Sequence, residues 1–211
     1  MQKDVAKDTI IKKWGKNRLN YFHQFAGIGW IIGKNDSKKI DLNNIKSINA
    51  FYGIKYKLKI NQYYAMGFSL EYDIYSYYIK KNDSVVFPDN SKNKIEKFNF
   101  NALEFTYYNR LNIKKRGNHI GNYLDIGIFG DLNYKSKHIK KYTDSNDDVN
   151  YKIASYNYGF INKYNYGLLV NIGFNRYVVF CKYRLSDLFQ TPHYKYPELS
   201  RFSAGIQINI F

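Results

Sequence analysis

The chain has 211 residues, a formal net charge of +16 and 19% aromatic residues. Its length fits a single domain, and its one cysteine, Cys181, excludes an internal disulfide bond. No apolar run reaches the roughly eighteen residues that a transmembrane helix needs. That excludes a helical membrane protein, but it leaves open a membrane β-barrel, whose strands are apolar on one face only.

The N-terminal stretch is polar and charged. We expect residues 1–19 to form a periplasmic N-terminal segment and residues 20–211 to form an outer-membrane β-barrel. The first four residues, from Met1 to Asp4, resemble the start of a mature chain. An outer-membrane location therefore implies a signal peptide that was removed or replaced.

Apolar and polar residues alternate along much of the chain, which predicts strands with one apolar face. The pattern is clearest from Phe202, where Ala204 and three isoleucines share a face and Ser203 and Gly205 share the other. Eight strands are expected, over residues 21–32, 46–59, 63–80, 96–112, 120–140, 152–174, 177–188 and 202–211. The sixth is expected to run unbroken through Asn162 and Lys163, because a division there would give nine strands and put the C-terminus on the wrong side.

The connections between these strands alternate in length. Long ones follow the first, third, fifth and seventh strands, and all three prolines lie in them. Short turns with long outer loops are typical of outer-membrane barrels. The predicted fold is therefore all-β, an eight-stranded antiparallel up-and-down transmembrane β-barrel with short periplasmic turns and long extracellular hairpins.

Charged residues decide which face of each strand is inside. Lys or Arg facing lipid near mid-bilayer costs about 2–4 kcal/mol, so the charged positions are assigned to the lumen. The expected lumen charge network has five residues of each sign: Lys55, Lys57, Arg110, Lys182 and Arg184 against Glu71, Asp73, Glu104, Asp125 and Asp131. A salt-bridge plug is favoured over an active site or an ion path, because a barrel of this size is filled by its own side chains.

Residues suited to catalysis or metal binding are scattered. His23 and His119 are expected near the periplasmic end, and His138 and His193 in the outer region, so no pair has metal-ligand spacing. Ser136 precedes His138 by two residues, but strand spacing does not predict a triad. We expect no catalytic residues, no cofactor and no metal.

Two basic clusters stand out. Near the outer leaflet, Lys135, Lys137, Lys140 and Lys141 are candidates for contact with lipopolysaccharide phosphates. The cluster at residues 114–116 could face phospholipid headgroups or a periplasmic partner. A solvated charged rim is the alternative for both. Nucleic-acid binding is not expected, because the basic residues are divided between opposite ends of the strands.

Several motifs together resemble a known family. They are Phe25-Ala-Gly-Ile-Gly-Trp30, Tyr52-Gly-Ile-Lys-Tyr-Lys57 with the Asn61 turn, Tyr183-Arg-Leu-Ser-Asp-Leu-Phe189, and Pro197-Glu-Leu-Ser-Arg-Phe-Ser-Ala-Gly205 with the terminal Phe211. The pattern resembles the small outer-membrane β-barrel proteins of Bacteroidota, which include the PorT-like proteins. The resemblance implies a link to type IX secretion and gliding, and it transfers no catalytic residues.

The expected function is a non-enzymatic outer-membrane barrel that serves as a structural or accessory component, as in a protein-secretion or outer-membrane assembly complex. Its expected partners are outer-membrane lipid, lipopolysaccharide and other outer-membrane or periplasmic proteins. One alternative is a lipid-modifying barrel enzyme. Another is a soluble lipocalin-like barrel, which requires an apolar interior and a polar exterior.

Overall fold

The computed structural model describes residues 13–33, 42–79, 95–114, 117, 119–143, 150–156, 161–190 and 198–210. These residues form nine β-strands. The strands are β1 (Asn20–Ile32), β2 (Ile48–Lys59), β3 (Tyr64–Ile79), β4 (Ile95–Asn112), β5 (Asn122–Thr143), β6 (Asn150–Tyr156), β7 (Tyr164–Phe174), β8 (Tyr177–Arg184) and β9 (Phe202–Ile210). In the described residues, no helix is long and apolar enough to cross a membrane.

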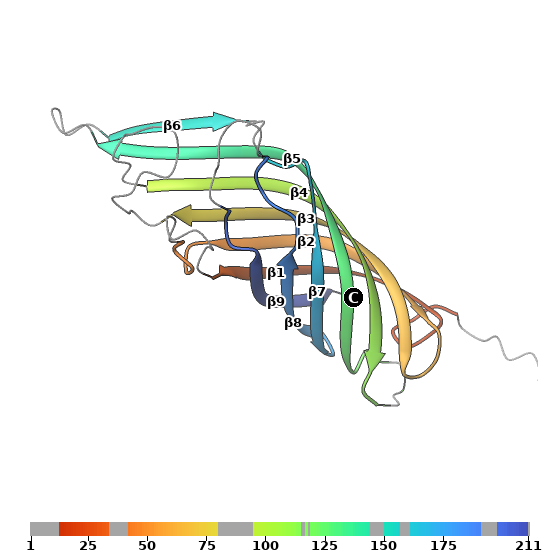
Figure 1. Ribbon diagram of the computed structural model, residues 1–211. Coiled ribbons are helices and arrows are strands. Elements are labelled where there is room, and N and C mark those ends of the chain that lie inside the picture. The colour runs from red at the N-terminus through yellow and green to blue at the C-terminus, as the bar shows by residue number, and fades with distance from the viewer. Residues whose placement is uncertain are drawn as a thin grey trace, which may run out of the picture.

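The strands form a closed antiparallel barrel with eight positions (Figure 1). Each strand pairs with its neighbour in sequence from β1 to β5 and from β7 to β9. The first and last strands then pair with each other, with Gln24 opposite Ile210 and Ile32 opposite Phe202. The predicted all-β barrel is therefore confirmed, including the closing role of the C-terminal strand.

The prediction of an unbroken sixth strand is wrong. It is divided into β6 and β7, which both run antiparallel to β5: β6 pairs with residues 137–143 and β7 with residues 122–132. The strand is interrupted, but the chain keeps its direction, so β6 and β7 share one position in the barrel. The interruption has a physical reason. Near it, the Asn162 amide donates to the Leu188 carbonyl at 2.8 Å, and Ile161 bridges to Phe189.

Two short turns have the expected residues. At the β2–β3 turn, the Asn61 side chain accepts hydrogen bonds from the amides of Tyr63 and Tyr64, both at 2.8 Å. At the β7–β8 turn, Asn175 has a φ of 56°, a left-handed conformation that asparagine tolerates well. Both turns lie at the end of the barrel where β1 begins and β9 ends, which we call the turn end; the opposite end is the loop end.

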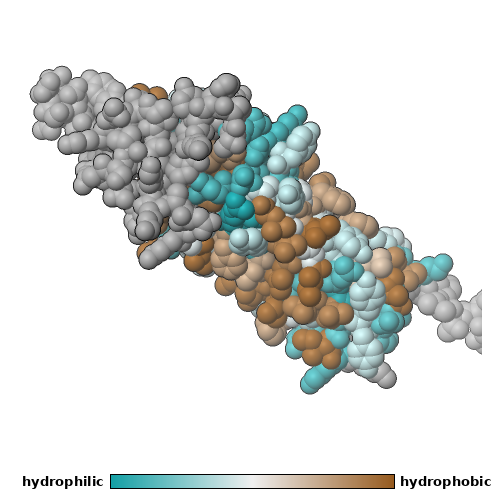
Figure 2. Space-filling model, viewed as in Figure 1, coloured by the Kyte–Doolittle hydropathy of each residue, from teal (hydrophilic) through white to brown (hydrophobic). Residues whose placement is uncertain are grey.

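The two faces of the barrel wall differ sharply. Along β7 exposed and buried residues alternate without a break, and the exposed ones are all tyrosine, leucine, valine, isoleucine or phenylalanine. Figure 2 shows apolar side chains gathered over the middle of one side of the molecule, with polar side chains toward its ends. The outside is thus apolar and the inside carries the charges.

The wall is taller on one side. At the loop end, β3, β4 and β5 extend beyond most of the others, with 16, 18 and 22 residues against 11, 8 and 9 for β7, β8 and β9, and the short β6 pairs with the far end of β5 (Figure 1). A bulge lies in β5, because Ala102 pairs with Asn133 and Asn101 with Lys135, which leaves Tyr134 unpaired. Beyond the bulge, the residues that face inward have even numbers instead of odd ones.

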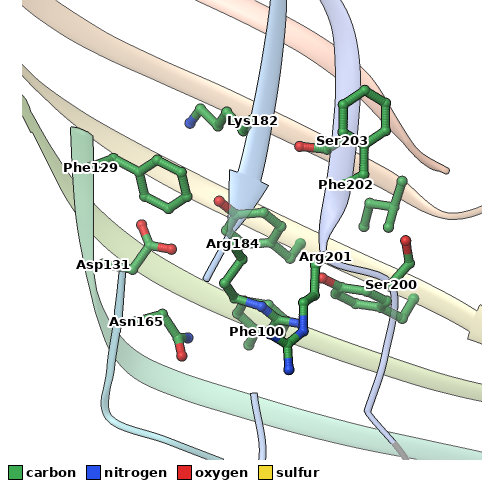
Figure 3. Close-up of a pocket in the computed structure, with 13 residues that line it drawn as sticks. Phe100, Phe129, Asp131, Asn165, Lys182, Arg184, Ser200, Arg201, Phe202 and Ser203 are labelled. Atoms are coloured by element: carbon green, nitrogen blue, oxygen red, sulfur yellow. The ribbon is translucent and has the colours of Figure 1, made fainter. Parts of the chain in front are cut away.

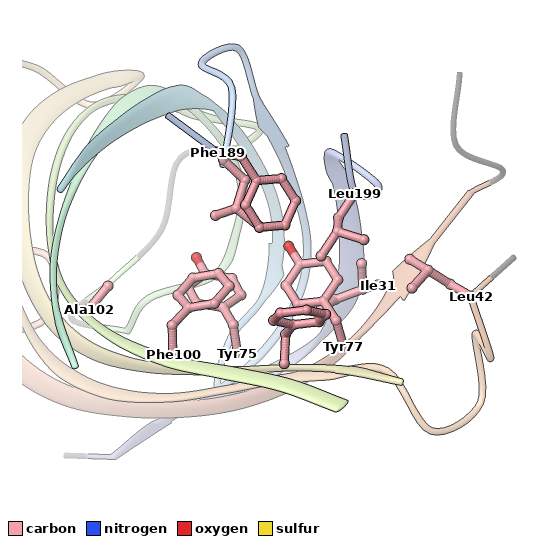
Figure 4. Close-up of a cluster of buried hydrophobic side chains, with 10 residues drawn as sticks. Ile31, Leu42, Tyr75, Tyr77, Phe100, Ala102, Phe189 and Leu199 are labelled. Atoms are coloured by element: carbon pink, nitrogen blue, oxygen red, sulfur yellow. The ribbon is translucent and has the colours of Figure 1, made fainter. Parts of the chain in front are cut away.

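Both ends of the lumen are closed by packed segments. At the loop end, Leu188, Phe189 and Leu199 pack on aromatic side chains of the tall wall, among them Tyr75 and Phe100 (Figure 4). At the turn end, residues 13–19 cover the lumen: the Lys57 ammonium donates to the Lys16 carbonyl at 2.5 Å and the Asn17 amide to the Gly117 carbonyl at 2.8 Å. Residues 1–12 of the expected periplasmic segment and the terminal Phe211 lie outside the described residues.

Candidate functional site

The ten residues expected to form the lumen charge network are all buried. None has more than 7% of its surface exposed. Strand alternation puts them inside, because each shares its face with buried neighbours two residues away, as Lys182 does with Phe180 and Arg184. What the alternation does not determine is which charges meet.

An acidic cluster surrounds Lys182 in the middle of the barrel. The Lys182 Nζ atom lies 2.5 Å from Glu71, 2.8 Å from Glu104 and 3.5 Å from Asp73. The carboxylates are also held by neutral donors, since Asn49 donates to Asp73 at 2.8 Å and the Thr106 hydroxyl to Glu104 at 2.9 Å. One ammonium thus serves three carboxylates from two strands of the opposite wall.

A basic cluster lies nearer the turn end. Arg110 donates two hydrogen bonds to Asp125, at 2.6 and 2.8 Å, and its guanidinium stacks 3.5 Å from the Tyr123 ring. The Lys55 ammonium is 3.9 Å from the same carboxylate and lies over two aromatic rings, those of Phe25 at 5.0 Å and Tyr108 at 4.9 Å. Here two cations share one carboxylate.

The network is therefore segregated along the barrel axis. The expected network has five residues of each sign, but carboxylates outnumber cations around Lys182 and cations outnumber carboxylates around Asp125. Aromatic rings help to accommodate the excess, because the negative face of a ring attracts a cation. Phe51 lies 4.8 Å from the Lys182 ammonium and close to the Phe180 ring between the two clusters.

The acidic cluster has a spacing that could hold a metal ion. One carboxylate oxygen each from Glu71, Asp73 and Glu104 lies within 4.8 Å of the others. The Lys182 ammonium lies among them at hydrogen-bonding distance, so this cluster already contains a cation of its own. The arrangement is that of a buried ion pair with several acceptors rather than an open coordination site.

Arg184 has a partner that strand periodicity did not predict. Its guanidinium donates to Glu198 at 2.6 Å and to the Leu199 carbonyl at 3.1 Å. Glu198 also accepts from the Leu188 amide, at 3.0 and 3.1 Å, and therefore ties together the two parts of the loop that cover the barrel. Burial raises the pKa of Glu198, and the nearby Arg184 opposes that rise. This residue was missed because it lies in a loop, where alternation gives no signal.

The two cavities described inside the lumen are small. One of about 20 Å³ lies between Asp131, Arg184 and Arg201 at the loop end (Figure 3), and one of about 10 Å³ lies beside Glu71 and Lys182. A cavity needs about 10–15 Å³ for one water molecule. Neither of these two has room for a solute larger than water.

The described histidines make separate contacts. His23, on β1 at the turn end, stacks on Tyr21, with ring centroids 4.8 Å apart. His138, on the tall part of β5, bonds to Glu96 at 2.7 Å and stacks on Phe98. His119 lies between β4 and β5, and His193 is outside the described residues. The three described histidines have no common neighbour among these contacts.

The four lysines expected to meet lipopolysaccharide do not all share a face. Lys135, Lys137 and Lys141 alternate on the outer face of β5 beyond the bulge. Lys140 alternates with them, on the face of the buried His138, and lies opposite Glu96. The second basic cluster is described only at Lys114, which is exposed at the turn end.

No protein-family model matches the chain, and no curated protein matches it significantly. The site must therefore be interpreted from its own chemistry.

Proposed function

We propose that this chain is an outer-membrane β-barrel with a non-enzymatic, structural or accessory role. The observation that carries the proposal is the reversed distribution of polarity. Large apolar side chains cover the outside of the wall, while ten Lys, Arg, Asp and Glu residues of the strands are buried inside. In water, an apolar surface of this extent is unfavourable, and contiguous patches of it mark contact with a membrane or another protein.

The lengths of the strands support a bilayer as that environment. β7, with 11 residues, matches the roughly 9–11 residues that a tilted strand needs to cross the hydrocarbon core. Short turns at one end and tall strands at the other match a periplasmic and an extracellular side. The lipocalin-like alternative needs an apolar lumen, which the buried Lys182 and Arg110 clusters oppose.

The filled lumen supports a structural role over a pore. Lys182 and its carboxylates fill the middle of the lumen, Arg110 lies nearer the turn end, and Leu188 and Phe189 close the loop end. The described cavities admit water at most. A solute could cross only if the buried ion pairs were broken, which is strongly unfavourable. The filled lumen therefore favours a role that depends on contacts through the outer surfaces of the barrel.

A finer proposal is membership of the small outer-membrane barrel proteins of Bacteroidota, with a role in a secretion or assembly complex of the type IX kind. It rests on sequence motifs alone. Two of them meet at the closing seam of the barrel, where Gly29 on β1 lies opposite Gly205 on β9. A Cβ atom on Gly205 would lie 2.3 Å from the Gly29 Cα, so this part of the pattern also has a packing reason.

A pair of matched variants tests the membrane placement. Ile128 on the outer face of β5 and Ile113 at the turn end are equally exposed, at 59% and 58%. In a bilayer, Ile128→Lys should lower the stability of the barrel in lipid vesicles by about 2–4 kcal/mol, and Ile113→Lys by about 0–1 kcal/mol. Equal effects of the two substitutions, or folding of the chain in water without detergent, would contradict the proposal.

The secretion role has a separate test. Cross-linking in native outer membranes, followed by purification of the tagged chain, should recover components of a secretion or assembly complex. Recovery of the barrel alone would remove the complex from the proposal and leave the membrane placement intact.

A further inference from the structure

The tall part of the barrel carries lysines on its outer face, just beyond the apolar band. Register and the Tyr134 bulge bring them together from three adjacent strands. We call this surface the lysine face; it consists of Lys97 on β4, Lys135, Lys137 and Lys141 on β5, and Lys152 on β6. All five are exposed or half-buried.

The register of the three strands sets the layout of this surface. Lys135 is opposite Asn101, Lys137 lies between Asn99 and Tyr156, and Lys97 is opposite Ile139. Without the bulge, Lys135 and Lys137 would point to the inside of the wall. The three β5 lysines of this face therefore point outward because of one inserted residue.

No acidic residue lies on this face among the described residues of β4, β5 and β6. The nearest acid on these strands, Glu96, is on the inner face and bonds to His138 at 2.7 Å. At the top of the face, Lys141 and Lys152 are directly opposite each other. Like charges in this position repel and destabilise a sheet, and an anion held between them removes that cost.

Tyrosines place the lysines at the level where lipid headgroups begin. Lys97 lies over the Tyr78 ring at 4.5 Å, and Lys137 over the Tyr156 ring at 4.8 Å. Just below, Tyr72 and Tyr134 contact each other, with centroids 6.0 Å apart. Tyrosine is enriched at membrane interfaces, so this group marks the edge of the hydrocarbon region.

The height of the lysine face selects among anionic lipids. From Lys135 to Lys141 the strand rises about 20 Å, or about 15 Å along the membrane normal for a strand tilted by about 40°. The polar layer of a phospholipid leaflet is only about 5–8 Å thick. A ligand that meets lysines at all these heights must carry anionic groups at its lipid anchor and also well above it.

We propose that the lysine face binds the phosphate groups of lipopolysaccharide in the outer leaflet. The lower pair, Lys135 and Lys137, meets the phosphates of the lipid anchor, and the upper pair, Lys141 and Lys152, meets those of the core sugars. This inference rests on the proposed membrane placement. It adds that lipopolysaccharide binds preferentially to one side of the barrel, the lysine face.

The test uses the full chain folded in neutral phosphatidylcholine vesicles, titrated with lipopolysaccharide, with dephosphorylated lipopolysaccharide and with phosphatidylglycerol. Two double variants, Lys135→Gln/Lys137→Gln and Lys141→Gln/Lys152→Gln, remove the lower and upper pairs. The control is Lys13→Gln/Lys114→Gln, two exposed lysines of the turn end. We expect each test variant to weaken lipopolysaccharide binding about tenfold or more, and the control variant less than about twofold.

Three results would overturn the inference. One is equal binding of phosphatidylglycerol, which would show unspecific attraction to negative charge. Another is binding that survives dephosphorylation, and the third is an equal loss in the control variant. A chain that inserts into vesicles but shows any of these leaves the membrane placement standing. A chain that fails to insert contradicts the proposed function first.

Discussion

Lys182 on β8 and Glu71 on β3 meet inside the barrel, 111 residues apart in the chain, with 2.5 Å between Nζ and Oε1. The same ammonium reaches Glu104 on β4 at 2.8 Å. The contact crosses the lumen from wall to wall, so it fills the barrel and links strands that are not neighbours. The predictions below test this interior and the segments that close it.

Removing the ammonium of Lys182 should destabilise the barrel. Lys182→Met keeps a long side chain but leaves Glu71 and Glu104 buried without their cation, a change that typically costs about 3–5 kcal/mol. We expect the urea midpoint of unfolding from vesicles to fall, or refolding to fail. Lys114→Met, at the exposed turn end, is the control. Adding Glu104→Gln to the methionine variant should restore part of the loss; a single variant as stable as the parent chain would contradict the assignment.

The planar geometry of the Arg110 guanidinium should contribute to the stability of the barrel, in addition to its charge. Arg110→Lys keeps the charge but can no longer donate two parallel hydrogen bonds to Asp125 or stack flat on Tyr123. We expect a loss of about 1–3 kcal/mol in the same unfolding measurement. Arg201→Lys, at a partly exposed ion pair with Asp187, should cost about 0–1 kcal/mol. Similar effects of the two substitutions would show that the buried fork is not important.

Close packing should make Gly67 irreplaceable. A Cβ atom there would lie 2.0 Å from the Tyr56 carbonyl oxygen and 2.5 Å from the Tyr108 hydroxyl oxygen. Gly67→Ala should therefore cost at least about 1–3 kcal/mol. At Gly130, the nearest atom to an added Cβ is 3.9 Å away, so Gly130→Ala should be within about 0.5 kcal/mol of the parent. Heat-modifiable migration on gels compares the stability of the two variants. A stable Gly67→Ala barrel would show that the neighbouring strands can move to accommodate a methyl group.

Glu198 should make closure of the loop end depend on pH. Burial raises its pKa above the ordinary value of about 4.3, so the closed loop binds its proton more tightly than the open loop does. Closure is then most stable below the ordinary value, and it weakens as pH rises from there through the raised pKa. Proteolysis of the loop across this range measures the change. In the Glu198→Gln variant, the rate of proteolysis should not depend on pH in this range. If the dependence persists in that variant, another group is responsible for it.

Much of the interior could be predicted from local pattern. Because exposing charge to lipid is costly, Lys182 and Arg184 of β8 were predicted to face the lumen, and both are buried. The Asn61 turn also follows local residue types, because asparagine suits tight turns. These features depend on a few consecutive residues and on the fixed period of a strand.

Other features depend on residues distant in sequence. The interruption between β6 and β7 arises because Asn162 hydrogen-bonds to the last loop at Leu188. The Tyr134 bulge shifts the register of the tall wall and sends Lys135 outward. Glu198 becomes the partner of Arg184 only when that loop folds over the lumen. In each case the interacting residues are too far apart in sequence to fall within one local pattern.

The sequence by itself determined the closed barrel and the face on which each charge of the regular strands lies. A strand turns its side chains to alternate sides with a period of two, and that rule is local. Only the tertiary structure decided that three carboxylates gather on Lys182 and that two cations gather on Asp125. Contacts across a barrel depend on register and on the tilt of the strands, which are properties of the closed sheet as a whole.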